Sequence, residues 1–115
     1  MRITINRKSF AVTLADNTLS QSISAMCPIK LNMSRSGGHE YYAALPKKVN
    51  TAGAPETSLV HRGGIYYFAA WNAFSLVFKD ADIAPYSVHI VGEAEDELVS
   101  VLEHSDGTIT ITMEE

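Results

Sequence analysis

Short stretches in which apolar and polar residues alternate recur along the whole chain, and this period of two constrains the fold more than any other feature. Residues 2–6 and 10–14 alternate in this way, and residues 6–8 form the natural turn of a hairpin between them. The same alternation returns at residues 29–34 and 108–113. Each segment predicts a strand with one face towards a core.

The middle of the chain is its most apolar part. Residues 65–70 and 74–79 are rich in aliphatic and aromatic side chains, and Trp71-Asn72-Ala73 joins them, which predicts another hairpin. After Pro85, residues 88–91 read as one more strand. Because both faces of residues 65–70 are apolar, we expect both faces of that strand to be covered.

Two segments favour helices. Three residues suited to helix capping, 16–18, precede an apolar stripe with helical spacing that Pro28 ends. Within this segment, Thr18 and Gln21 have the spacing of a capping box. Residues 95–103 predict a second helix, whose acidic start suits the positive end of the helix dipole.

The expected order of elements is β-β-α-β, a long connection, and then β-β-β-α-β. The strands are too short and too closely spaced for parallel crossovers, so the sheet should be mainly antiparallel. Curling the sheet shut would protect its edges. We therefore expect residues 1–115 to form one mainly β domain, a closed antiparallel barrel with two helices that cap its open ends. The connection over residues 35–63 should be functional or carry short strands of its own.

Charge and composition exclude several classes of protein. The net charge is −4, and the acids concentrate in residues 93–97, which disfavours nucleic-acid binding. No segment approaches the roughly 20 apolar residues of a membrane helix. The N-terminal residues show no apolar signal region, so we expect a cytoplasmic protein. Cys27 is the only cysteine, so no disulfide forms within the chain, and we expect a half-buried structural thiol.

Motifs for metal, phosphate or nucleophilic chemistry are not evident. The four histidines have neither the helical spacing nor a cysteine partner typical of a metal site, so we expect no metal and no cofactor. Neither a phosphate-binding loop nor a Gly-x-Ser-x-Gly elbow is present. A catalytic carboxylate pair would have to combine Glu40 with Asp80 or Asp82, and solvated loop acids are the simpler interpretation.

Four segments together carry a family resemblance. They are TLADNT at residues 13–18, CPIKL at 27–31, HEYYAALP at 39–46, and the stretch 64–80 that holds GIYYFAAW and FSLVFKD. In this order, and over nearly the whole chain, they resemble the small prokaryotic cyclophilin-like proteins. The resemblance implies a compact closed antiparallel β-barrel with two helices, in agreement with the alternation pattern.

What the resemblance implies for activity is less direct. Eukaryotic-type cyclophilins are peptidyl-prolyl isomerases that use an arginine beside an apolar, aromatic-rich proline pocket. Here Arg35 and Arg62 are the only arginines past Lys8, and neither lies in a segment that resembles the catalytic one. We therefore assign the catalytic role to neither, and whether the protein is an enzyme stays open.

The aromatic side chains are the most informative candidates for a site. We expect Phe68 and Phe78 to fill the barrel, whereas Trp71 lies in a predicted turn, where a large ring has no obvious packing role. If the long connection folds across the central hairpin, one groove rim would combine five residues. These are Glu40, Tyr42, Trp71, Phe74 and His89.

Three functions are compatible with this pattern. The first is a binding domain whose aromatic groove takes a peptide or a small-molecule ligand, with neither nucleic acid nor membrane as a partner. The alternative is a peptidyl-prolyl isomerase with an atypical active site, since this reaction needs only a pocket that desolvates the amide and a hydrogen-bond donor. The third is an oligomerisation module, so both monomer and homodimer remain open.

Overall fold

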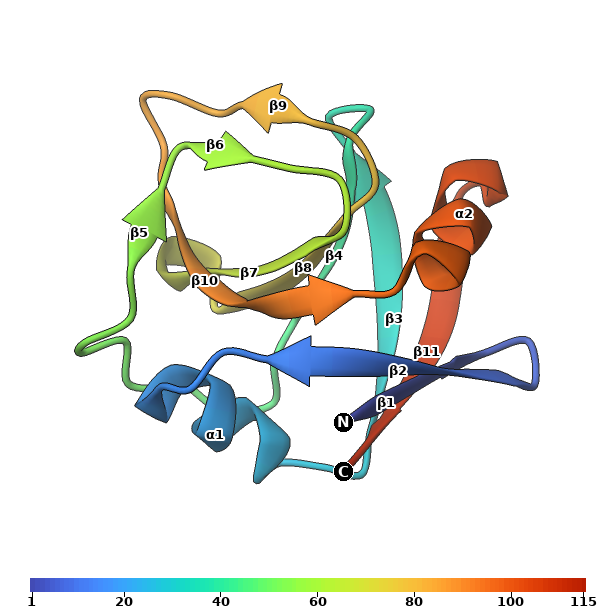
Figure 1. Ribbon diagram of the computed structural model, residues 1–115, viewed down its shortest axis with the longest axis horizontal. Helices are drawn as coiled ribbons and strands as arrows, with labels where there is room; N and C mark the ends of the chain where they lie inside the picture. The colour runs from blue at the N-terminus through green and yellow to red at the C-terminus, as the bar shows by residue number, and fades with distance from the viewer.

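Eight strands pair edge to edge into a closed barrel in the computed structural model, which describes all 115 residues (Figure 1). The barrel strands are β1 (Arg2–Ile5), β2 (Lys8–Leu14), β3 (Ile29–Ser36), β4 (Glu40–Ala44), β7 (Gly64–Phe68), β8 (Ala73–Val77), β10 (Val88–Ala94) and β11 (Thr108–Glu114). Their order is β2-β1-β11-β3-β4-β8-β7-β10, and β10 pairs with β2 to close the ring. Every pairing is antiparallel, so the predicted closed antiparallel barrel is confirmed.

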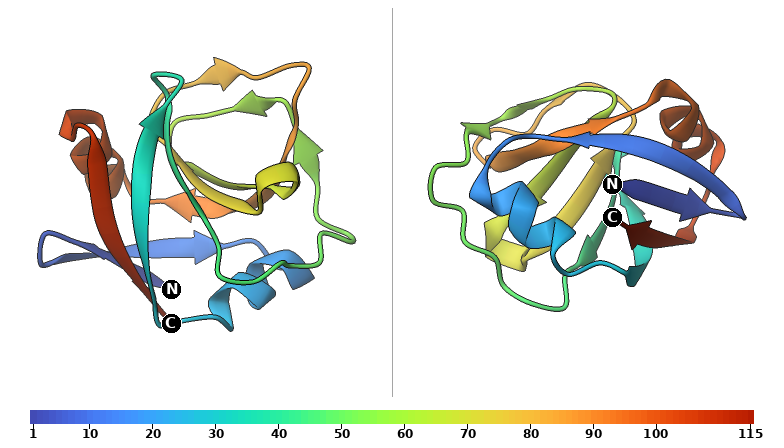
Figure 2. Two further views of the ribbon diagram at one scale, coloured as in Figure 1. Left: turned by 180° about the vertical axis from the view of Figure 1, so that it is seen from behind. Right: turned by 60° about the horizontal axis from the view of Figure 1, so that its bottom comes forward.

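The two ends of the chain lie side by side in the barrel wall. Strand β1 pairs with β11, which places Ile3 opposite Met113, and both termini lie close together in each view (Figures 1 and 2). The first hairpin turns at Asn6 and Arg7, which both have positive φ, at 51° and 69°. Positive φ at both central residues is characteristic of a type I′ turn, whose twist matches the right-handed twist of the two flanking strands.

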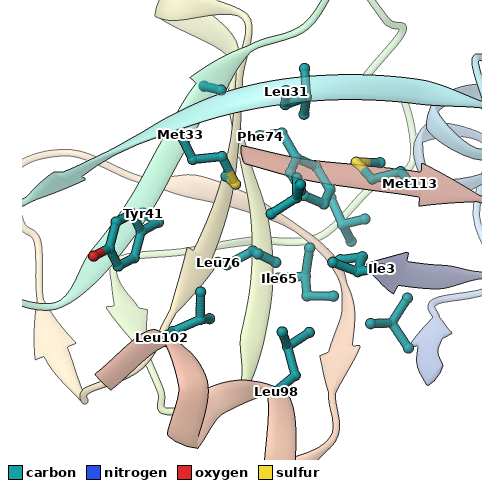
Figure 3. Close-up of a cluster of buried hydrophobic side chains, with 14 of the residues drawn as sticks. Ile3, Leu31, Met33, Tyr41, Ile65, Phe74, Leu76, Leu98, Leu102 and Met113 are labelled. Carbon is teal, nitrogen blue, oxygen red and sulfur yellow. The ribbon is translucent and has the colours of Figure 1, made fainter. Parts of the chain in front are cut away.

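A single interior core fills the barrel. The inward side chains of the strands meet those of the helices α1 (Thr18–Ser24) and α2 (Asp96–His104), as the close-up shows for Leu98 and Leu102 of α2 (Figure 3). The helices lie apart from each other against the barrel (Figure 1), and each buries its apolar side in this core. The predicted pair of helices is thereby confirmed.

The N-terminal cap of α1 differs from the expected one. Asn17 is the capping residue, and its side-chain oxygen accepts a hydrogen bond of 2.8 Å from the backbone N–H of Ser20. Thr18 is already the first residue of the helix, so Thr18 and Gln21 do not form the capping box that their spacing suggested. Adjacent capping residues compete, and Asn is at least as good a cap as Thr.

The long connection carries short strands, as expected. It contains β4, which enters the barrel wall, together with β5 (Glu56–Thr57) and β6 (Leu59–Val60). Strand β5 pairs with β10 outside the barrel, and β6 pairs with β9 (Ala81–Asp82) in a separate ribbon. Figure 1 shows this ribbon away from α1, and the left view of Figure 2 shows it from behind.

The β6–β9 ribbon gives the outer face of β7 and β8 a second, smaller hydrophobic cluster. Val60, Tyr66, Val77 and Val88 are buried in it, and each is at most 7% exposed. Ile65 and Tyr67 of the same strand β7 point into the barrel instead. Both faces of this strand are therefore covered, as its apolar composition predicted.

Neither helix is long enough to cross a membrane, since α1 has seven residues and α2 has nine.

Cys27 is half-buried and free, and burial raises the pKa of its thiol. This environment agrees with the expected structural role.

Closure of the barrel depends on Gly92, and its substitution should be costly. A Cβ at this position would lie 2.2 Å from the backbone oxygen of Thr13 on β2. We expect Gly92→Ala to lower the free energy of unfolding by about 3 kcal/mol, measured by urea denaturation. The control is Gly53→Ala, where a Cβ has open space and only the positive φ of 79° adds a cost, about 1 kcal/mol. Equal losses in the two variants would contradict this role of Gly92.

Candidate functional site

A groove of about 560 Å³ lies on the outer face of the barrel, beside the β6–β9 ribbon. We call it the aromatic groove. Its lining combines residues from the end of β3 and the turn after it, from β4, from β7 and the turn after it, from β8, and from the segment between β9 and β10. They are Ser36, His39, Glu40, Tyr42, Phe68, Ala70, Trp71, Ala73, Ser75, Asp82, Ile83, Ala84, Tyr86 and Val88.

The floor of the groove is made of small side chains on β8. Ala73 and Ser75 point outwards, each 3% exposed, while Phe74 between them points into the barrel. Alternate side chains of a strand face opposite sides of the sheet. Because an alanine and a serine stand where larger residues would fill the space, the groove stays open.

Four aromatic rings form a continuous row along the groove. Tyr42 and Trp71 have ring centroids 5.9 Å apart, Trp71 and Phe68 5.4 Å, and Phe68 and Tyr86 6.2 Å. The last two pairs meet edge to face, a favourable arrangement for aromatic rings. Trp71 is 62% exposed and Tyr86 63%, so both present large apolar surfaces to solvent.

Asn72 holds Trp71 in place. Trp71 ends a short 3-10 helix, η1 (Ala69–Trp71), and Asn72 follows in the left-handed conformation, with φ of 50°. The Asn72 side-chain N–H groups donate to the backbone oxygens of Leu45 and Lys47, at 3.1 and 3.0 Å. Its side-chain oxygen accepts from the Tyr67 hydroxyl, and burial raises the pKa of this phenol above its usual value. The turn that carries Trp71 is therefore held by three side-chain hydrogen bonds.

A carboxylate marks the polar end of the groove. Glu40 is a quarter exposed, and its two oxygens face different partners. One accepts a hydrogen bond from the Ser75 hydroxyl, and the other lies 3.1 Å from His39 Nε2. The side chain of Glu40 is thus held beside the ring row.

The charged groups of the groove are of one sign apart from the ionisable His39. Asp82 lines the groove together with Glu40, and neither a lysine nor an arginine does. Asp80 lies elsewhere, where it accepts a 2.7 Å bond from the backbone N–H of Arg62. Of the two carboxylate pairs considered from the sequence, Glu40 and Asp82 both line the groove, whereas Glu40 and Asp80 do not.

The structure brings together three of the five residues that the sequence placed on one rim. Glu40, Tyr42 and Trp71 all line the aromatic groove. Phe74 does not, because it is fully buried inside the barrel. His89 does not either, since its ring lies beside Ala54 and Glu56, while its neighbour Val88 lines the groove.

Several groove residues were missed or misassigned from the sequence. Phe68 was expected to fill the barrel, but it alternates with the inward Tyr67 and so lies outside, half-buried in the groove, whereas Phe78 does belong to the interior core. Tyr86 was not singled out, although an aromatic residue directly after Pro85 in a loop is a usable signal of exposure. Ser75 gave no signal, because its role depends on the pairing of β4 with β8.

Both arginines that were considered as isomerase donors lie outside the groove. Arg35 stacks over the ring of Phe78, with its guanidinium carbon 4.3 Å from the centroid, and donates a 2.7 Å bond to the backbone oxygen of Ser105. Arg62 forms ion pairs with Asp96 and Glu103 on α2. Both guanidinium groups therefore serve to attach α2. No group of three or more His, Cys, Asp or Glu side chains is placed to hold a metal ion.

Comparison with known proteins relates the chain to one family and to a solved structure. The model of the Cyclophilin-like family matches residues 3–114. Among solved structures, the chain is similar to the solution structure of a hypothetical protein from Archaeoglobus fulgidus, with a TM-score of 0.65 and 20% sequence identity over 98% of this chain and 91% of that one. This similarity concerns the fold alone. Among curated proteins, none is significantly similar.

Removing the Asn72 side chain should loosen Trp71. We expect Asn72→Ala to lower the free energy of unfolding by about 3 kcal/mol, because it removes several hydrogen bonds and a residue tolerant of positive φ. The fluorescence anisotropy of Trp71 should fall as its ring gains freedom. Tyr67→Phe, which removes one of these bonds, should cost about 1 kcal/mol and change the anisotropy less. Unchanged anisotropy in Asn72→Ala would show that Trp71 is held by other contacts.

Proposed function

The chain belongs to the Cyclophilin-like family, and we propose that it uses the barrel as the scaffold of a binding domain whose aromatic groove takes a peptide segment or a small-molecule ligand. The family resemblance read from the sequence is confirmed by the match over residues 3–114. The binding function is our proposal, and it is supported by the composition and geometry of the groove.

One observation carries the proposal. Trp71 and Tyr86 expose about two-thirds of their surfaces at a concave site whose floor consists of small, buried side chains. Exposed aromatic surface next to a cavity is unfavourable in water unless something covers it. Ligand pockets typically combine such apolar walls with a few fixed polar groups, which Glu40 and Ser75 provide here.

The rigidity of the groove also favours binding. Asn72 and its hydrogen bonds fix the turn that carries Trp71, and the neighbouring rings pack edge to face. A site that is ordered beforehand loses less conformational entropy when a ligand binds.

The single free cysteine further suits a reducing compartment, so we propose that the protein acts in the cytoplasm.

The isomerase alternative has less support. It requires a donor beside the bound amide, and Arg35 and Arg62 both donate to groups on or next to α2, outside the groove. We therefore do not extend the proposal to catalysis. A protease-coupled assay on a proline tetrapeptide would detect the activity if another group supplies the donor.

Trp71 is the only tryptophan, so its fluorescence reports directly on the groove. We expect at least one member of a panel of proline-containing peptides and metabolites to change its emission. Calorimetry with the same ligand should show that Trp71→Ala weakens binding at least about tenfold. Truncation of an aromatic side chain at the centre of a binding site typically costs about 2 kcal/mol or more of binding free energy.

The matched control for this variant is Leu59→Ala. Leu59 is 66% exposed, close to the 62% of Trp71, but it lies on β6 and does not line the groove. Its replacement should leave binding unchanged. If Leu59→Ala weakened binding as much as Trp71→Ala, the ligand would sit elsewhere and the assignment of the groove would be wrong.

A further inference from the structure

We propose that the aromatic groove recognises an organic cation, and specifically a trialkylammonium group. This inference rests on the proposed binding function and narrows it to one class of ligand. It is carried by the charge of the groove, by the row of rings, and by the hydrogen bonds that its carboxylates already make.

The charge of the groove favours a cation. Glu40 and Asp82 are its two carboxylates, and neither lysine nor arginine lines it. His39 lies against Glu40 and is the one groove side chain able to become positive. A partly enclosed apolar site with unbalanced negative charge attracts positive ligands and disfavours anionic ones.

The rings supply a second attraction for the same charge. Tyr42, Trp71, Phe68 and Tyr86 follow one another at centroid distances of 5.4 to 6.2 Å. A cation near the face of an aromatic ring is attracted by the electron density of the ring, and tryptophan is the strongest partner. Trp71 is 62% exposed, so its ring is accessible to a cation.

The existing hydrogen bonds distinguish a trialkylammonium from a primary amine. One Glu40 oxygen accepts a hydrogen bond from the Ser75 hydroxyl, and the other lies 3.1 Å from His39 Nε2. One Asp82 oxygen accepts a 3.0 Å bond from the backbone N–H of Ala84. A primary ammonium has three N–H donors to satisfy when it leaves water. A trialkylammonium carries the charge but donates no hydrogen bond, so it needs no acceptor beyond those that the groove already uses for its own hydrogen bonds.

The decisive experiment compares two ligands of nearly the same shape, choline and its neutral carbon analogue 3,3-dimethylbutan-1-ol. Both are titrated against the Trp71 fluorescence of the full chain at pH 8, with sodium chloride added to match ionic strength. We expect choline to bind about tenfold more tightly, because only choline gains cation–π and charge interactions. Equal binding of the two would overturn the cation inference and leave the proposed binding function intact.

Variants then test the role of the carboxylate. Glu40→Gln keeps an acceptor for Ser75 and His39 but removes the charge, and we expect it to weaken choline binding about fivefold, with less than about a twofold change for the neutral analogue. Glu97→Gln makes the same change of net charge at an exposed site on α2, away from the groove, and should leave both ligands unaffected. If Glu40→Gln unfolds, Asp82→Asn, at an exposed residue of β9, tests the other negative charge of the groove.

A further arm identifies the source of the group. A short peptide with trimethyllysine is compared with the same peptide carrying the neutral tert-butyl analogue. Tighter binding of the trimethyllysine peptide than of choline would indicate a protein side chain as the ligand, and the reverse order a free small cation. If neither cation changes the signal while an uncharged peptide or metabolite does, the cation inference is wrong and the binding function stands.

Discussion

Strand β10 pairs with a strand on each of its sides, and this double pairing fixes the geometry of the barrel. On one side β10 pairs with β7, and on the other it closes the barrel against β2. This closure brings the two backbones so near that Gly92 has no space for a Cβ. Once the ring is closed, no barrel strand has a free edge, and each strand is fixed in register by two neighbours. The inward and outward faces of every strand are set by the same step.

The alternation of side chains along β8 contributes both to the interior core and to the candidate site. On β8, Phe74 completes the interior core, and Ala73 and Ser75 on its flanks make the floor of the groove. A shift of register by one residue would send the small side chains into the core and the phenylalanine into the groove. The core therefore holds the groove in its geometry, because the register that buries Phe74 is the one that leaves the floor open.

The long connection adds what the barrel by itself lacks. Its β6–β9 ribbon covers the outer face of β7 and β8 and buries a second cluster around Tyr66 and Val77. This cover ends at Tyr86 and Trp71, where the apolar surface remains open to solvent. The groove is thus the uncovered margin of a second hydrophobic layer, which explains why rings gather there in a row. Arg35 and Arg62 are engaged with α2 and its C-terminal end, so neither brings a positive charge to the groove.

Alternation, turn residues and helix-ending prolines are local signals, so the hairpins and the two helices could be predicted from the sequence. The closed barrel followed as the arrangement that leaves no sheet edge exposed. The sequence also placed Glu40, Tyr42 and Trp71 in one site, since the first two lie in the long connection and the third in the turn it was expected to cross. That Phe68 lines the groove, whereas Phe74 and His89 do not, could be seen only once the strands were paired. Alternation along a strand shows which side chains share a face, but it does not show which of the two faces points into the barrel. Where both faces of a strand are apolar, only pairing with strands distant in sequence decides which side chain is enclosed and which remains at the surface.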